Sequence, residues 1–374
     1  MPPTTDIAAA SRPLCKSLPR AARRVAVACA AACLVAGCSD FEFYWQGIAG
    51  QTDLLARAKP ISEVIASTPD PALKRRLVRA QEIRSFASRE LGLPDNRSYT
   101  SYADLERPYA VWNVFATAEL SLTPRQWCFP VAGCVAYRGY FAEADARAEA
   151  ARLKAAGDDV HLSGIPAYST LGYFDDPVLS TFLRYREVEF ARLIFHELAH
   201  QVVYVKDDTS FNESFAVAVE EAGIARWLAA EARTRGTAEA AELASDAERG
   251  HELRAAFRTL VEATRERLAA LYASNASDDE KRAGKAAAFA AMRADYEALK
   301  AASSGSLAFE RWFAAGANNA GIASVSLYAD QVPQFAALLA AEDGDLRRFY
   351  ARVKALAALP KAEREPALIA AARR

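Results

Sequence analysis

The most informative stretch of the chain is HELAH at residues 196–200, which satisfies the pattern H-E-x-x-H. Residues four apart lie on one face of a helix, so His196 and His200 can bind one metal ion while Glu197 lies beside it. Two neutral imidazole nitrogens would hold the ion, and the carboxylate would reach a water molecule bound there. A chance match would require two of only four histidines to fall in this register. Helical spacing is indicated by the apolar residues Val188, Leu193, Ile194 and Val203.

A catalytic zinc ion takes a third protein ligand and leaves a position open for water. The segment NESFA, residues 212–216, follows after a short loop. It resembles the N-E-x-F-A segment of the gluzincin metallopeptidases, especially the alanyl-aminopeptidase-like group. That resemblance implies Glu213 as the third ligand. It also implies that Glu220, two helical turns further on, is the acid that orients a ligand imidazole.

The chain departs from that peptidase group in two respects. Only twelve residues separate His200 from Glu213, whereas nineteen separate His200 from Glu220, so spacing alone favours Glu220 as the ligand. Ser210 and Glu213 also fit a capping box, in which Glu213 would merely satisfy a helix terminus. We favour Glu213 as the ligand because N-E-x-F-A is a composite match.

The second departure is that no G-A-M-E-N motif precedes the predicted zinc helix, so the acid that would hold a free substrate amine is unassigned. The segment at that place is YSTLGYFDDP, residues 168–177. As a strand it could pair with an extended peptide, with Asp175 or Asp176 anchoring an amine. Asp176-Pro177 equally fits a helix N-cap followed by a first-turn proline, and we favour that interpretation for Asp176.

Taken together, these motifs resemble the bacterial family of predicted zinc-dependent aminopeptidases over nearly all of the mature chain. The resemblance implies one Zn²⁺ ion held by His196, His200 and Glu213. Glu197 would act as general base in hydrolysing a peptide substrate. A tyrosine often stabilises the oxyanion in gluzincins, and Tyr328 is the candidate, with Tyr168 and Tyr204 behind it. Packing is the competing role for each, because the chain has 14 tyrosines.

Two other functions fit part of the sequence. An envelope endopeptidase would have no need of the missing amine-binding motif. A zinc-binding structural or partner-binding lipoprotein would keep the metal site without turnover, but it would have no use for Glu197. His251-Glu252-Leu253 repeats only the first half of the zinc motif, and His251 is expected on a helix surface.

The N-terminal segment has the features of an export signal. Residues 1–37 carry a charge of +4, and an uncharged run ends in Val35-Ala36-Gly37-Cys38, which resembles the bacterial lipobox. The resemblance implies a signal peptide at 1–37 and lipid anchoring through Cys38 at a membrane surface. Ser39, rather than Asp, follows the cysteine, which favours the periplasmic face of the outer membrane. A plain secretory signal cleaved elsewhere is the alternative.

Two of the six cysteines, Cys128 and Cys134, remain in the folded body besides Cys38. In an oxidising periplasm they are expected to form a short-loop disulfide. Half of a metal site is the alternative, but a second cysteine pair is missing. The net charge of −1 falls to −5 without the signal peptide, so nothing indicates a nucleic-acid partner.

The elements around the motif predict a single metallopeptidase domain, residues 38–374, that is α+β and predominantly α-helical. N-terminal helices are expected over 38–108, with a cap at Asp70 and a stop at Gly92. A small sheet with one right-handed strand–helix–strand crossover is expected over 109–185. Zinc-site helices should follow over 186–233. A helical C-terminal part, 234–374, would contain paired helices at 237–274 and 278–302.

Overall fold

The computed structural model describes residues 42–129, 133–302, 309–326 and 331–372. The predicted signal peptide, Cys38 and Tyr328 lie outside these ranges. The chain divides into residues 1–48 and a compact unit, Ala49–Arg374. Residues 42–48 of the first unit are helical, as are residues 49–57 of the second. Within the described ranges, no helix combines the length and apolar character needed to cross a membrane.

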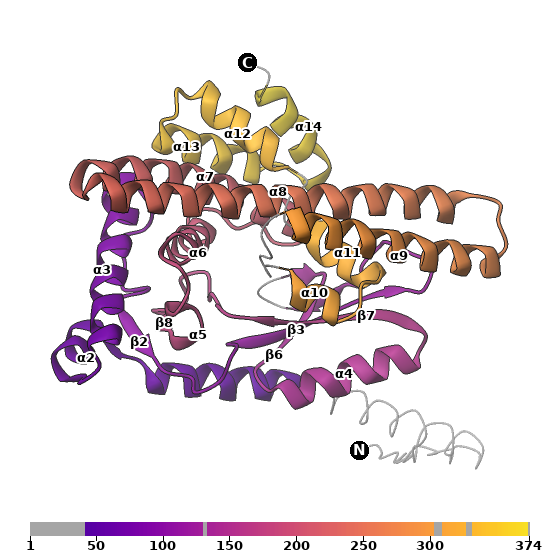
Figure 1. The fold of residues 1–374 in the computed structure, drawn as a ribbon, viewed down its shortest axis with the longest axis horizontal. Helices are drawn as coiled ribbons and strands as arrows, with labels where there is room; N and C mark the ends of the chain where they lie inside the picture. Colours follow the sequence, from indigo (N-terminus) through magenta and orange to yellow (C-terminus); the bar gives the residue numbers. More distant parts are fainter. Residues whose placement is uncertain (1–41, 130–132, 303–308, 327–330, 373–374) are drawn as a thin grey trace, which may run out of the picture. The chain divides into compact units, whose positions relative to one another are not determined.

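Helices dominate the second unit and strands are few, so the predicted α+β, mainly helical class is confirmed (Figure 1). The strands are β1 (Lys59–Pro60), β2 (Ser101–Ala103), β3 (Val111–Ala118), β4 (Trp127–Phe129), β5 (Gly133–Val135), β6 (Arg138–Tyr140), β7 (Asp158–Ile165) and β8 (Val178–Leu179). The helices are α2 (Ile61–Ser67), α3 (Pro71–Leu91), α4 (Glu143–Ala155), α5 (Ser180–Leu183), α6 (Glu187–His200), α7 (Thr209–Thr234), α8 (Thr237–Ala273), α9 (Asp278–Ala302), α10 (Glu310–Ala314), α11 (Asn319–Ser326), α12 (Val332–Ala341), α13 (Leu346–Ala357) and α14 (Lys361–Ala371).

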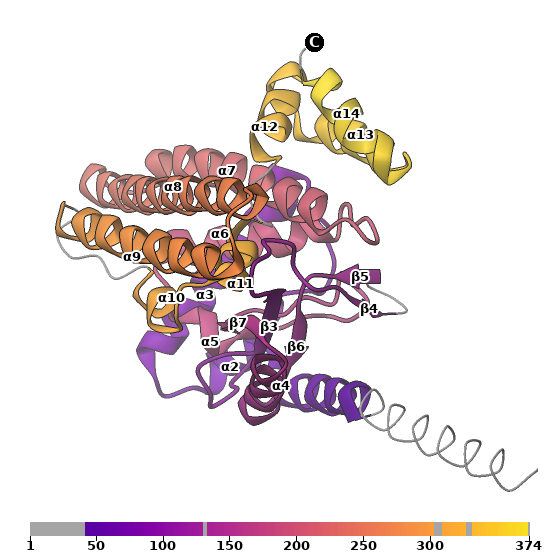
Figure 2. The ribbon, with the colours of Figure 1, turned by 90° about the vertical axis from the view of Figure 1, so that its right-hand side faces the viewer.

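The sheet nearest the candidate site has the order β6-β3-β7, and β3 is antiparallel to both neighbours. Helix α4 connects β6 to β7, which run parallel with β3 between them, so the predicted strand–helix–strand connection is present. Helix α4 contacts β3 and β7, as does α11, and the two helices lie on opposite faces of the sheet (Figures 1 and 2). Strand β7 ends at Ile165, because Pro166 has no N–H for the ladder.

The helix termini follow local chemistry. Asp70 caps α3 by accepting a hydrogen bond of 2.7 Å from the N–H of Ala72, and Pro71 occupies the first turn. Gly92 ends the same helix with φ of 64°, a left-handed conformation that glycine adopts without steric cost. Helices α8 and α9 contact one another and occupy the two stretches predicted for paired helices.

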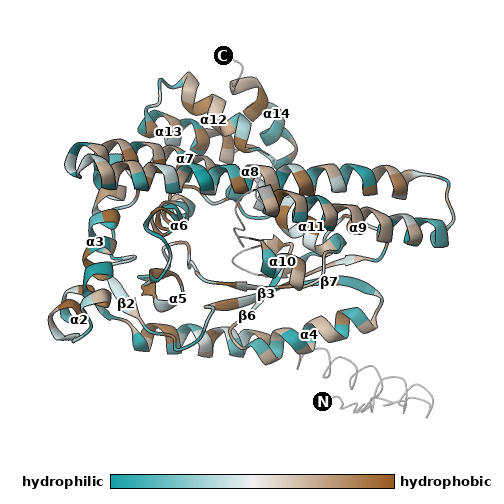
Figure 3. Cartoon of the chain, in the orientation of Figure 1, coloured by the Kyte–Doolittle hydropathy of each residue, from teal (hydrophilic) through white to brown (hydrophobic). Residues whose placement is uncertain are grey.

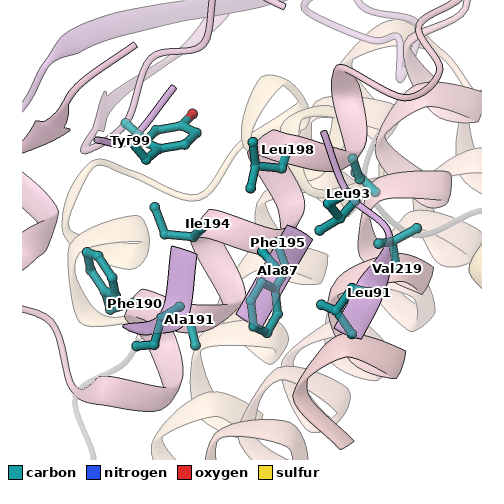
Figure 4. Close-up of a cluster of buried hydrophobic side chains, with 14 of the residues drawn as sticks. Ala87, Leu91, Leu93, Tyr99, Phe190, Ala191, Ile194, Phe195, Leu198 and Val219 are labelled. Carbon is teal, nitrogen blue, oxygen red and sulfur yellow. The ribbon is translucent and has the colours of Figure 1, made fainter. Parts of the chain in front are cut away.

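Helix α6, which carries H-E-x-x-H, runs through the main hydrophobic core. Nine of its 14 residues are buried, so apolar side chains surround it rather than forming one stripe. Figure 4 shows Phe190, Ile194, Phe195 and Leu198 of this helix among buried residues of α3 and α7, and Figure 3 shows α6 as largely apolar. The metal motif therefore lies on a helix held on several sides by packing.

Helices α6 and α7 pack closely at Gly223. A Cβ atom at this position would lie 2.8 Å from Cδ2 of Phe195 and 2.9 Å from Cδ1 of Leu91. Both contacts are shorter than van der Waals distance, so a larger residue would push α7 away from α6 and α3. The spacing between the two helices that carry the candidate ligands therefore depends on this glycine.

We expect Gly223→Ala to lower the free energy of unfolding by about 1–3 kcal/mol, the usual cost of overpacking a core. The matched control is Gly47→Ala, because Gly47 is also helical and no described atom lies within 4 Å of its added Cβ. That control should leave stability unchanged or raise it by up to about 1 kcal/mol through helix propensity. Urea unfolding measures both, and equal effects would contradict the close packing.

Candidate metal centre

The two histidines of α6 present their Nε2 atoms to each other at 3.2 Å. They lie one helical turn apart, and their rings are nearly perpendicular, with centroids 4.8 Å apart. His200 is buried, and His196 is partly buried. The helix thus places two imidazole nitrogens on one face, as the spacing predicts.

Glu213 of α7 completes a group of three. Its Oε2 lies 3.2 Å from Nε2 of His196 and 3.7 Å from Nε2 of His200. All three atoms lie within 4.8 Å of one another. Within the described part of the chain, His196, His200 and Glu213 thus form a group that could hold a metal ion. The structure therefore brings the three predicted ligands to one point, although Glu213 comes from a different helix.

The other residues of NESFA explain how Glu213 reaches that point. The side chain of Asn212 accepts a hydrogen bond of 2.7 Å from the N–H of Val205 and donates one of 2.8 Å to its carbonyl, which fixes the α6–α7 loop. Ser214 is fully buried and accepts from the N–H of Gln331. Phe215 fills the core against Phe335. Each position of the motif thus has a structural role on a different side of α7.

The capping alternative for Glu213 is excluded by the start of α7. The N-cap residue is Asp208, whose side chain accepts from the N–H of Phe211, so Ser210 lies inside the helix. Asp208 also pairs with the buried Arg364 of α14. The helix terminus is satisfied without Glu213, whose carboxylate is turned to the histidines.

Glu220 lies two turns beyond Glu213 on α7 and contacts the other nitrogen of the His196 ring. Its Oε2 is 2.9 Å from Nδ1 of His196, and its Oε1 accepts a hydrogen bond of 3.0 Å from Arg192. Since a carboxylate only accepts, Nδ1 carries a proton, and Nε2 is the nitrogen that faces Glu213 and could bind a metal ion. Glu220 therefore sets the tautomer and the orientation of His196. It is not one of the three grouped ligand atoms.

The electrostatics of the group favour positive charge at its centre. Burial acts to lower the pKa of His196, but hydrogen bonds to Glu213 and Glu220 outweigh it and raise the pKa well above the ordinary value. Burial acts to raise the pKa of Glu213, but the charge of His200 and the bonds to both imidazoles lower it to about 2. Two ionised carboxylates beside the histidines thus stabilise a cation, which can be a proton or a metal ion.

Glu197 lies between the two histidines in sequence but takes no part in this network. Within the described residues, its carboxylate has no hydrogen bond or ion pair, and it is only partly buried. Burial is the main cause of a raised pKa, which His196 and His200 partly offset. An unpartnered carboxylate with a raised pKa is chemically suited to accepting a proton.

Of the three tyrosines named as oxyanion candidates, Tyr168 and Tyr204 lie in the described part of the chain, and both make packing contacts. Tyr204 packs edge-on to His200 at 6.5 Å between ring centroids, whereas Tyr168 packs against Phe141 at 5.2 Å. Sequence reasoning missed Tyr137, whose pKa is raised by burial and then by the nearby charges of Glu213 and Glu197. Its only sequence signal is its place three residues after Cys134.

The segment at residues 168–177 is a loop, so the prediction of a strand there is wrong. Asp176 is 1% exposed, and its carboxylate accepts from the N–H and the hydroxyl of Thr170 at 2.8 and 2.9 Å. It closes this loop instead of capping a helix, and α5 begins at Ser180. Asp175 forms an exposed ion pair with Arg97 at 3.3 Å.

A disulfide joins Cys128 on β4 to Cys134 on β5, which pair as a hairpin. The N–H of Cys134 donates to Asp207 in the α6–α7 loop, so the hairpin is tied to the segment between the two metal-site helices. Gly133 has φ of 76°, and a Cβ atom there would overlap with Asp207, so glycine is required for this approach. His251 is exposed on α8, as expected.

The fold and the site define a mainly helical α+β protein in which two histidines and one glutamate form a group that could hold a metal ion. The chain matches the family described as "Putative aminopeptidase" over residues 42–368, and it belongs to that family. No curated protein and no solved structure matches it. Membership supports peptide hydrolysis as the activity and agrees with the family resemblance seen in the sequence.

We expect Glu220→Gln to weaken metal binding about 10–100-fold, the usual effect of removing a partner that orients a ligand imidazole. The reason is that a neutral amide holds the protonated Nδ1 of His196 less firmly and removes the nearer of the two carboxylates that pair with Arg192. The matched control is Glu221→Gln, the same change one residue along α7. Competition with a chelating dye measures both affinities, and equal values for the two variants would contradict the role of Glu220.

Proposed function

We propose that this protein is a zinc-dependent aminopeptidase. The observation that carries the proposal is the triangle of ligand atoms, with sides of 3.2, 3.2 and 3.7 Å. Ligand atoms about 2.0–2.1 Å from a tetrahedral zinc ion lie about 3.3–3.5 Å from one another. Two imidazole nitrogens and one carboxylate oxygen are also the donor set of many catalytic zinc sites. The gluzincin resemblance of H-E-x-x-H and N-E-x-F-A supports the same metal.

The chemistry follows from the residues around that triangle. Zinc, when bound, acts as a Lewis acid that polarises the scissile carbonyl and lowers the pKa of water. Glu197 has no other partner in the described structure and takes the proton from the attacking water. The same carboxyl group then returns the proton to the leaving amine. Glu220 and Arg192 hold His196 in the required tautomer throughout.

Tyr328 remains the sequence candidate for stabilising the oxyanion, with Tyr168 and Tyr204 behind it. We add Tyr137, because the charges of Glu213 and Glu197 act on its hydroxyl. A neutral phenol, kept protonated by its raised pKa, can donate a hydrogen bond to a developing oxyanion. The exopeptidase assignment rests on the family name, since the amine-binding acid is unassigned.

We further propose a location at the periplasmic face of the bacterial cell envelope, with a lipid anchor on Cys38 and a disulfide between Cys128 and Cys134. The lipobox-like sequence supports the anchor. A disulfide pair is expected in an oxidising compartment. The partners of the chain are then its peptide substrate and the membrane surface.

The hydrolytic mechanism predicts that Glu197→Gln lowers kcat by about 10²–10⁴ while zinc content stays at one ion per chain, because the base is lost and the ligands remain. The test compares the two proteins, purified from Ser39 onward, on peptides with free and acetylated amino termini. Glu252→Gln, the glutamate of the half motif at His251, is the matched control and should leave kcat unchanged.

The outcomes separate the possible functions. Loss of activity on acetylation supports the aminopeptidase, and equal cleavage of both peptides indicates an endopeptidase. Bound zinc with no turnover on any peptide would contradict hydrolysis and leave a metal-binding lipoprotein.

The anchoring proposal predicts that Cys38→Ser abolishes incorporation of a labelled fatty acid and moves the protein out of the membrane fraction, because the acylated thiol is gone. Cys29→Ser, which changes a cysteine inside the predicted signal peptide, is the control and should leave labelling intact. A plain secretory signal would give no labelling in either protein.

A further inference from the structure

A second concave site lies beside the metal centre, and the reaction described above makes no use of it. It is a cavity of about 350 Å³ between the β3–β7 sheet and helices α7, α8, α10 and α11. This volume is in the range of cavities that bind small molecules. Aromatic rings form much of its wall: Phe257 stacks on Phe309 with centroids 3.9 Å apart, and Trp312 packs edge-on to Phe257 at 5.3 Å. Its lining thus suits an apolar group.

Several buried polar atoms of the cavity wall lack a partner among the described residues, and those of Trp312 and Arg254 are hydrogen-bond donors. His161 Nδ1, Trp312 Nε1 and Arg254 Nη2 are buried and have no hydrogen-bond partner among the described residues. Arg258 also has no ion pair within the described chain. Burial lowers the pKa of His161 to about 4, so its imidazole is neutral at pH 7. Donors left unpaired in an apolar wall are costly unless a ligand supplies acceptors.

The carboxylate of Glu220, which lines the cavity, already has hydrogen-bond partners. Both oxygens of Glu220 are bonded, one to His196 and one to Arg192. A ligand with an apolar body and a carboxylate would pair with the guanidinium group of Arg258, accept from the free Nη2 of Arg254 and place its apolar body against the aromatic wall. A cationic ligand would find no free counter-charge among the described lining residues.

Helix α7 contributes side chains both to the cavity and to the candidate metal centre. Val217 and Glu220 line it, and Glu213 lies one turn before Val217 on the same helix. A chain of alternating charges also joins the two sites: Arg254 pairs with Glu189 at 2.8 Å, Glu189 with Arg192 at 4.0 Å, and Arg192 with Glu220. An anion at Arg254 would therefore act on the groups that hold His196.

We propose that this cavity binds an apolar group that carries a free carboxylate. Two sources offer that chemistry: the C-terminal residue of a short peptide substrate, and a separate apolar carboxylic acid. The first source rests on the proposed peptidase function, whereas carboxylate binding itself does not. Arg258 on α8 is the residue that recognises the anion, and the aromatic wall holds the apolar body.

The test is a calorimetric titration of N-acetyl-L-phenylalanine into the metal-loaded full chain. The chain carries Glu197→Gln, so that turnover plays no part. We expect the acid to bind at least about tenfold more tightly than N-acetyl-L-phenylalanine amide, as a charge-assisted hydrogen bond provides. Arg258→Gln should remove that preference. Arg267→Gln, the same charge change at an exposed position of α8, should retain it. Thermal unfolding checks that both variants fold.

Equal binding of acid and amide, or an unchanged preference in Arg258→Gln, would overturn the proposal. Competition then identifies the source. If the dipeptide Leu-Phe displaces the acid and Leu-Phe amide does not, the ligand is the carboxyl end of a peptide. If neither displaces it while the acid binds with the Arg258 dependence, the ligand is a free acid. Failure of the proposed peptidase activity would appear in the kcat comparison and would leave these affinities unchanged.

Discussion

The hydrogen bond between Glu220 and His196 is the interaction on which the rest of the site depends. It joins α6 and α7, the two helices that carry the candidate ligands, and these helices pack closely at Gly223. A buried carboxylate is costly unless it is paired, and Glu220 is paired twice, with His196 and with Arg192. Because its second oxygen already has a cation, the carboxylate requires only a neutral N–H from the imidazole. When a metal ion takes the place of the proton on Nε2, His196 would be neutral and would direct that lone pair at the ion.

His200 is held by different forces. Its Nδ1 is buried and has no partner among the described residues. Packing along α6 and the edge-on contact with the ring of Tyr204 therefore hold this imidazole in place. The two histidines of one motif thus differ in how they are oriented, one by a carboxylate and one by the core. The fixed loop after α6 adds a second restraint, because Asn212 holds Val205 on both backbone groups. The ligand positions are consequently set by both helices and by the loop between them.

Features that depend on residues close together in the sequence could be predicted, whereas features that depend on residues far apart in the sequence could not. Helical periodicity, the cap at Asp70 and the H-E-x-x-H face are local, and all could be predicted from the sequence. The choice between Glu213 and Glu220 could not be made by counting residues, because a short loop changes which turn of α7 faces the histidines. The loop at 168–177 looked like a strand because of its aromatic residues, but hydrogen bonds from Thr170 to Asp176 bend it. Tyr137 and the cavity at Arg258 bring together strands and helices far apart in the chain, which no local pattern records.

The charge balance of the site also bears on why the fold keeps Glu197 free. Three other carboxylates in the described part of the chain are engaged near the histidines: Glu213 with both imidazoles, Glu220 with His196 and Arg192, and Glu189 with Arg254. These pairings hold carboxylates in the ionised form, whereas burial without a partner raises the pKa of Glu197. A general base must first accept a proton from water, and a carboxylate held ionised by a permanent cation would do so poorly. The same helix therefore separates two roles, since its histidines face the ligand carboxylate and its glutamate stays available for the proton.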